Sequence, residues 1–171
     1  MKNSVKAILT IATMACLIPA ASFALGNYAQ DFELLNMADA TALESDGWLI
    51  FGNVFDSSGG YLYGYGVFPA PNTGEAFCAI VDGQGGAAQG MQQLSVFNDY
   101  NNQDHAAGNL IEANVFQETV IESGDEGVWY FHFDGKMGNL EGSSTAIAFI
   151  KTLDPANGYA TTNFITVDMT N

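Results

Sequence analysis

The sequence predicts an all-β protein in which about eight or nine antiparallel strands form a sandwich. Short apolar runs recur at fairly even intervals, and segments rich in Gly, Pro and Asn separate them, such as 56–60, 69–74 and 82–86. Two runs, 128–136 and 145–151, alternate in side-chain type and flank a glycine-containing turn. We expect these two runs to pair as a long hairpin at the centre of the sandwich.

A secretory signal peptide is predicted at residues 1–24. Lys2 and Lys6 precede an apolar run that is too short to span a bilayer, and small residues around Ala24 end it. The alternatives are an uncleaved anchor and a lipoprotein acylated at Cys16. Because the apolar run continues past Cys16, cleavage after Ala24 is favoured. We therefore expect a secreted or periplasmic protein that does not insert into the membrane after cleavage.

Residues 25–171 suit a single β-sandwich domain, since no segment resembles an interdomain linker. The only helical pattern, 36–44, is short enough to be a turn or two within a loop. The expected strands follow in this order: 30–35, 48–55, 61–68, 76–81, 91–97, 110–121, 128–136, 145–151 and 163–169.

The chain is strongly acidic, with a formal net charge of −15 at pH 7. After signal cleavage its only basic side chains, histidines aside, are Lys136 and Lys151. Nucleic acids and anionic lipids are bound through clustered Lys and Arg, so both are excluded as partners. Direct capture of uronate or sulfated polysaccharides is also disfavoured unless metal ions bridge the charges. Abundant carboxylates make calcium sites easy to build.

The sequence favours a non-catalytic protein. Cys78, the only cysteine after cleavage, lies in an apolar run and is predicted to be a buried, inert thiol. His105 and His132 lack metal-ligand spacing, so a structural role is favoured. Motifs of serine hydrolases, phosphate loops and paired-cysteine metal sites do not occur. Glycosidases need only two suitably spaced carboxylates, so a small polysaccharide hydrolase or lyase remains the alternative.

Tyr61, Tyr63 and Tyr65 occupy alternate positions of an expected strand, with a leucine and two glycines between them. Alternation would direct three phenols to one face and leave the other nearly bare. Sugars bind with their apolar faces on aromatic rings and their hydroxyls on polar groups. We therefore predict a ligand-binding row of tyrosines. The alternative is that one or two of these rings belong to the core.

The most polar stretch is 98–105, which is rich in amides and carboxylates. It could bind sugar hydroxyls or coordinate calcium through oxygen atoms. It lacks the glycine and the final glutamate of an EF-hand loop. The alternative is a solvated loop held by Asx turns. The predicted ligand-binding residues in this stretch are Asp99, Asn101, Asn102, Asp104 and His105.

Short motifs are spread over most of the predicted mature chain: Asp31-Phe32-Glu33, Asp46-Gly47-Trp48, Phe116-Gln117-Glu118, Phe133-Asp134-Gly135-Lys136 and Ile165-Thr166-Val167-Asp168. Together they resemble carbohydrate-binding modules that have the galactose-binding-like jelly-roll fold. The resemblance implies a jelly roll and a structural calcium between the first and last strands. Carried over, the calcium ligands are Glu33 and Asp168, with Asp31 as a weaker candidate. The alternative is that these acids are ordinary surface charges.

These observations lead us to predict a secreted, non-catalytic jelly-roll module that binds a neutral polysaccharide or oligosaccharide and holds a structural calcium. The polysaccharide hydrolase or lyase named above is one alternative. The other is a matrix or surface structural protein that self-associates without saccharide.

Overall fold

The computed structural model describes residues 23–73, 77–98, 107–138 and 144–170. These residues are rich in β-structure, with antiparallel sheets, one short α-helix and one 3-10 turn. The prediction of an all-β protein is therefore confirmed, while the jelly-roll arrangement stays a prediction. None of the helices in this part of the chain has the length and apolar character needed to cross a bilayer.

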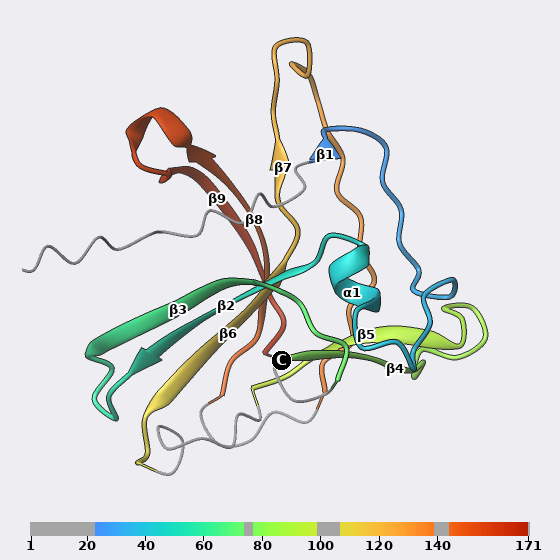
Figure 1. The fold of residues 1–171 in the computed structure, drawn as a ribbon, viewed down its shortest axis with the longest axis horizontal. Helices are drawn as coiled ribbons and strands as arrows, with labels where there is room; N and C mark the ends of the chain where they lie inside the picture. Colours follow the sequence, from blue (N-terminus) through green and yellow to red (C-terminus); the bar gives the residue numbers. More distant parts are fainter. Residues whose placement is uncertain (1–22, 74–76, 99–106, 139–143, 171) are drawn as a thin grey trace, which may run out of the picture. The chain divides into compact units, whose positions relative to one another are not determined.

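The chain divides into two compact units, Met1–Asp125 and Glu126–Asn171. In the first unit, β2 (Leu49–Phe55) is the centre of a three-stranded sheet. It pairs antiparallel with β3 (Tyr61–Pro69) on one side and with β6 (Leu110–Phe116) on the other (Figure 1).

Alternating burial along β2 defines the two faces of this sheet. Ile50, Gly52 and Val54 are buried, and the residues between them are only partly buried. Side chains alternate between the faces of a strand, so one face of the sheet covers the core of the first unit. The other face, which carries Phe51, Asn53 and Phe55 of β2, points away from that core.

Smaller elements complete the first unit. Strands β4 (Cys78–Asp82) and β5 (Gln92–Val96) form an antiparallel hairpin. Strand β1 (Phe23–Ala24) pairs in parallel with β7 (Thr119–Val120). The one α-helix of the described residues, α1 (Ala42–Ser45), is a single turn that overlaps the end of the predicted 36–44 and extends one residue beyond it.

The core of the first unit gathers apolar side chains from α1, β2 and the segment around β4. Burial of these side chains is the main favourable term in folding. The buried cluster consists of Ala42, Leu43, Ile50, Ala70, Phe77, Cys78 and Ile80.

The polar side chain of Asn72 is buried beside this cluster, and both ends of its amide are hydrogen-bonded. Its Nδ2 donates to the carbonyls of Met37 and Asp39, both at 3.0 Å. Its Oδ1 accepts from the backbone N–H of Ile80 at 2.7 Å. A buried amide is tolerated when its donors and acceptor are paired, so Asn72 joins the loop before α1 to β4.

The second unit contains one hairpin, formed by β8 (Ile147–Asp154) and β9 (Ala160–Asp168). The connection is a 3-10 turn, Pro155–Asn157, and Asp154 caps it by accepting from the N–H of Ala156 at 2.9 Å. Gly158 then has φ of +60°, which glycine adopts without strain.

Several predicted strands are confirmed with small shifts at their ends. The run 110–121 divides into β6 and β7, and the run 145–151 extends to Asp154 as β8. The runs that correspond to β2, β3, β4, β5 and β9 are 48–55, 61–68, 76–81, 91–97 and 163–169.

The predicted strand at 30–35 is wrong. Residues 32–35 form turns, in which the side chain of Gln30 accepts from the N–H of Phe32 at 2.7 Å. The side chain of Asp31 accepts from the N–H of Glu33 at 3.1 Å. Such side-chain bonds to nearby backbone compete with a β-ladder and favour turns.

The predicted central hairpin is also wrong, because residues 128–136 form no strand and β8 pairs with β9 instead. The segment follows Gly124 and Gly127, whose φ values of +111° and +152° interrupt extended backbone. Val128 and Tyr130 are 79% and 91% exposed. Alternation along 128–136 indicated a strand, but it carries no information about a pairing partner.

Candidate functional site

A β-bulge separates the tyrosines of β3. Tyr61 is opposite Phe55 and Tyr63 is opposite Val54, so Leu62 is an extra residue on β3. Directly opposed residues share a face, whereas Val54 and Phe55 are consecutive and point to opposite faces. Tyr61 and Tyr63 therefore lie on opposite faces of the sheet. The prediction that the three tyrosines share one face is wrong.

Tyr65 belongs to the core side of the sheet. Its ring packs against Phe77 with centroids 5.9 Å apart and lies over Gly52, where an added Cβ would be 2.6 Å from its Cζ. Tyr63 is on the same side, opposite Val54, with its ring 6.3 Å from that of Tyr65. The alternative prediction, that one or two of these rings belong to the core, is confirmed for Tyr65.

The candidate ligand-binding site lies on the other face of the sheet, which the sequence predicted to be nearly bare. We call it the distal face, because it points away from the core of the first unit. Register places Gly64 opposite Asn53 and Gly66 opposite Phe51. On the other side, β6 brings its polar residues to the same two positions of β2. The distal face consists of Leu49, Phe51, Asn53 and Phe55 of β2, Tyr61, Gly64 and Gly66 of β3, and Leu110, Glu112, Asn114 and Phe116 of β6.

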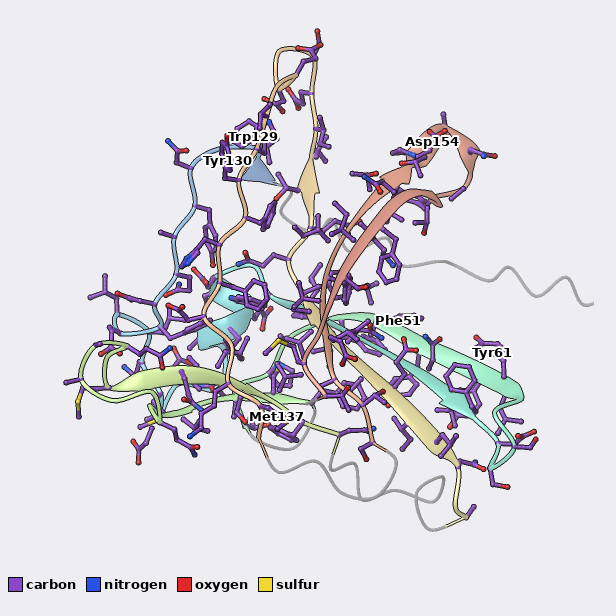
Figure 2. All side chains as sticks on the ribbon, turned by 180° about the vertical axis from the view of Figure 1, so that it is seen from behind. Phe51, Tyr61, Trp129, Tyr130, Met137 and Asp154 are labelled. Carbon is purple, nitrogen blue, oxygen red and sulfur yellow. The ribbon has the colours of Figure 1, made fainter. Side chains whose placement is uncertain are left out.

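Aromatic rings cover the two glycines of this face. A Cβ added to Gly64 would lie 3.1 Å from both the Cζ of Phe51 and the hydroxyl of Tyr61. Tyr61 also packs edge-on against Phe55, with centroids 5.8 Å apart. Figure 2 labels Phe51 and Tyr61 on this part of the sheet. Tyr61 is 61% exposed, so a flat ligand can contact its ring from outside the sheet.

A polar centre lies beside the rings. Oε1 of Glu112 accepts hydrogen bonds from Nδ2 of Asn53 at 3.0 Å and from Nδ2 of Asn114 at 2.9 Å. Each amide has a second N–H and a carbonyl oxygen, and the carboxylate has a second oxygen. The cluster therefore holds its own geometry and still has donors and acceptors for a ligand.

The predicted polar loop cannot be placed on this face. Asp99, Asn101, Asn102, Asp104 and His105 lie outside the residues that the structure describes. Their ligand-binding role stays a prediction.

The predicted calcium ligands have other partners in the structure. Oε1 of Glu33 accepts from the backbone N–H groups of Met91 and Gln92 at 2.6 and 2.7 Å. The hydroxyl and backbone N–H of Thr170 hold the pKa of Asp168 below its ordinary value.

Asp31 and Glu33 lie in turns rather than in a strand, and Asp168 ends β9 of the second unit. In the described residues, no group of three or more His, Cys, Asp or Glu side chains could hold a metal ion. The structural calcium stays a prediction, without the first strand on which it depended.

A hydrogen-bond network around Asp46 was missed by reasoning from the sequence. Its Oδ2 accepts from three donors, namely Tyr28 Oη at 2.8 Å, Gln30 Nε2 at 2.8 Å and Trp48 Nε1 at 3.0 Å. Nε2 of Gln117, just after β6, donates to the carbonyl of Asp46 at 2.7 Å. The motifs containing Asp46-Gly47-Trp48 and Gln117 therefore meet in space, and they have a structural role there.

Cys78 is buried, as predicted. Its Sγ donates to the carbonyl of Pro71 at 3.5 Å, and burial raises the pKa of the thiol to about 11. The thiolate is the nucleophilic form, so this side chain is unreactive at neutral pH.

We expect alkaline pH to destabilise the folded protein. Burial and the hydrogen bond to Asp46 raise the pKa of Tyr28 from 10.0 to about 12, and burial raises that of Cys78 from 9.0 to about 11. Above pH 9 the unfolded chain loses protons that the folded state keeps. The free energy of unfolding should therefore fall between about pH 9 and 12.

Urea unfolding at a series of pH values measures this slope. Tyr28→Phe and Cys78→Ala should each make the decline shallower, since each removes one of the two protons involved. An unchanged slope in the double variant would contradict this origin of the alkaline sensitivity.

Comparisons with known proteins identify no relative: no family model matches the sequence, and no curated protein or solved structure shows significant similarity to it. The function is therefore argued from the chemistry of the distal face.

Proposed function

We propose that the protein is a secreted, non-catalytic glycan-binding module of the jelly-roll type, and that the distal face holds the sugar. The observation that carries this proposal is that aromatic rings and an amide–carboxylate cluster lie on one face of the three-stranded sheet. This location replaces the tyrosine row that the sequence predicted.

The chemistry of the face suits a pyranose ring. A sugar has an apolar C–H surface, which packs on aromatic rings such as those of Phe51 and Tyr61. Its hydroxyls both donate and accept, and Asn53 and Asn114 offer both functions side by side. A face with apolar rings and a few placed polar groups is typical of a small-ligand site.

Charge limits the class of glycan. Residues 25–125 contain no Lys or Arg, and the polar centre of the distal face contains the carboxylate of Glu112. Uronate and sulfated polysaccharides would be repelled. A glycan without negative charge is therefore favoured, in keeping with the neutral polysaccharide expected from the sequence.

Binding is favoured over hydrolysis at this face. Glycoside hydrolysis needs two carboxyl groups on either side of the scissile bond. Among the residues that define the distal face, Glu112 is the single carboxylate. Its Oε1 is shared by two amide donors, an arrangement that holds a ligand contact in place.

The test is glycan binding by distal-face variants. We expect Phe51→Ala and Tyr61→Ala each to weaken binding about tenfold or more, because a buried aromatic contact contributes on the order of 1–2 kcal/mol. Tyr63→Ala is the matched control, since Tyr63 is 43% exposed but lies on the opposite face. A glycan array identifies the ligand, and titration calorimetry then measures the affinities.

Two outcomes would contradict the proposal. Folded Phe51→Ala and Tyr61→Ala proteins that bind like the wild type would exclude the distal face. A larger loss in Tyr63→Ala than in either would move the site to the other face. Thermal melting of each variant separates lost binding from lost folding.

A further inference from the structure

We propose that the distal face prefers sugars with a free, protonated amine, such as glucosamine oligomers, over their N-acetylated counterparts. This inference rests on the proposed function and names the class of glycan within it. It depends on the carboxylate of Glu112, on the absence of Lys and Arg from residues 25–125 and on the aromatic rings of the same face.

The first step is the arrangement of Glu112. Register places it directly opposite Asn53, and Asn114 is two positions further along β6 on the same face. Both amides donate to the same carboxylate oxygen, Oε1. Neither amide donates to Oε2, and no hydrogen bond to Oε2 is present among the described residues, so this oxygen can accept one from a ligand. Because the amides hold the carboxylate in one orientation, the ligand contact costs less side-chain entropy.

The second step is the missing positive charge. An ionised carboxylate in a binding face is ordinarily balanced by Lys or Arg, and residues 25–125 have neither. Glu112 therefore has no Lys or Arg partner within residues 25–125. A ligand that brings a cation would satisfy the carboxylate with a charge-assisted hydrogen bond, which is stronger than a bond to a neutral hydroxyl.

The third step is the aromatic border. Phe51 and Tyr61 lie over Gly64, on the same face as Glu112. Aromatic ring faces attract cations, and at exposed sites this attraction is worth about 0.5–1 kcal/mol. An ammonium group on a sugar can contact a ring and the carboxylate together. Acetylation removes the charge, so the N-acetylated sugar loses both interactions.

Titration calorimetry of two matched ligands tests the inference. The probes are a glucosamine tetramer and an N-acetylglucosamine tetramer, at low salt and about pH 6, where a primary amine is protonated. We expect the wild type to bind the amine-bearing tetramer about three- to tenfold more tightly, as exposed ion pairs and cation–π contacts allow. Glu112→Gln should abolish that preference and leave the affinity for the acetylated tetramer nearly unchanged.

Glu44→Gln is the matched control, because it removes one exposed carboxylate of α1, away from the distal face. It should keep the preference of the wild type. Equal loss of preference in the Glu44→Gln and Glu112→Gln proteins would show attraction by overall charge and overturn the inference.

The remaining outcomes separate the two proposals. Equal affinity of the wild type for both tetramers overturns the amine preference but leaves glycan binding in place. Binding of neither tetramer also overturns the preference, and the glycan array then decides whether the proposed function survives. Melting temperatures of both variants confirm that each protein is folded.

Discussion

Leu43→Ala is expected to lower the free energy of unfolding by about 2–5 kcal/mol. Leu43 lies in α1 and is fully buried among the side chains of the core. A helix of four residues has no stability of its own, so the packing of Leu43 keeps α1 on the sheet. Truncation removes apolar contacts and leaves a cavity. Alanine itself favours helix, so the loss would come from packing.

Urea unfolding followed by circular dichroism measures this change, and Leu34→Ala is the matched control. Leu34 is 96% exposed, and its truncation should change the free energy of unfolding by less than about 0.5 kcal/mol. Similar losses in the two variants would show that burial of Leu43 does not stabilise the first unit.

Gly52→Ala is expected to cost about 1–3 kcal/mol, although alanine normally stabilises a strand relative to glycine. The added Cβ would lie 2.6 Å from the Cζ and 2.8 Å from the hydroxyl oxygen of Tyr65. Tyr65 cannot move freely, because its ring packs against Phe77 in the core. The methyl group would therefore displace Tyr65 or separate β2 from β3.

A double-mutant cycle with Tyr65→Ala measures the conflict directly. If the ring causes the strain, Gly52→Ala should cost much less in a Tyr65→Ala background than in the wild type. Gly138→Ala is the control, since a Cβ at Gly138 meets nothing within 4 Å. Purely additive effects of Gly52→Ala and Tyr65→Ala would contradict the proposed contact.

These two positions also explain how the distal face arises. Tyr65 fills the space above Gly52 on the core side of the sheet, and Phe51 and Tyr61 fill the space above Gly64 on the other side. Because Leu62 is an extra residue on β3, Tyr61 lies on the distal face. This bulge therefore places Tyr61 on the distal face and Tyr63 and Tyr65 on the core side of the sheet.

Several properties follow from the sequence alone, because they depend on local pattern or on composition. Alternating and apolar runs identified β2 to β6, β8 and β9, since a buried strand needs apolar side chains wherever it is placed. The apolar surroundings of Cys78 in the sequence indicated its burial. The acidic composition predicts that nucleic acids are not partners, and this prediction does not depend on the fold.

Pairing and register were decided only by the tertiary structure. Side chains have period two along a strand, so one extra residue transfers every side chain beyond it to the other face. The bulge at Leu62 therefore could not be read from the alternation of Tyr61, Tyr63 and Tyr65. The side-chain pattern of a strand also does not identify its partner, so the sequence could not show that β8 pairs with β9 rather than with 128–136.

The distal face and the Asp46 network likewise needed the three-dimensional arrangement. Asn53 and Glu112 are far apart in the chain and meet because β2 and β6 are hydrogen-bonded neighbours. Asp46 and Gln117 meet through the same pair of strands. The sequence determined which residues could line a sheet, and long-range strand pairing decided which of them share a face, because local side-chain pattern does not encode the partner of a strand.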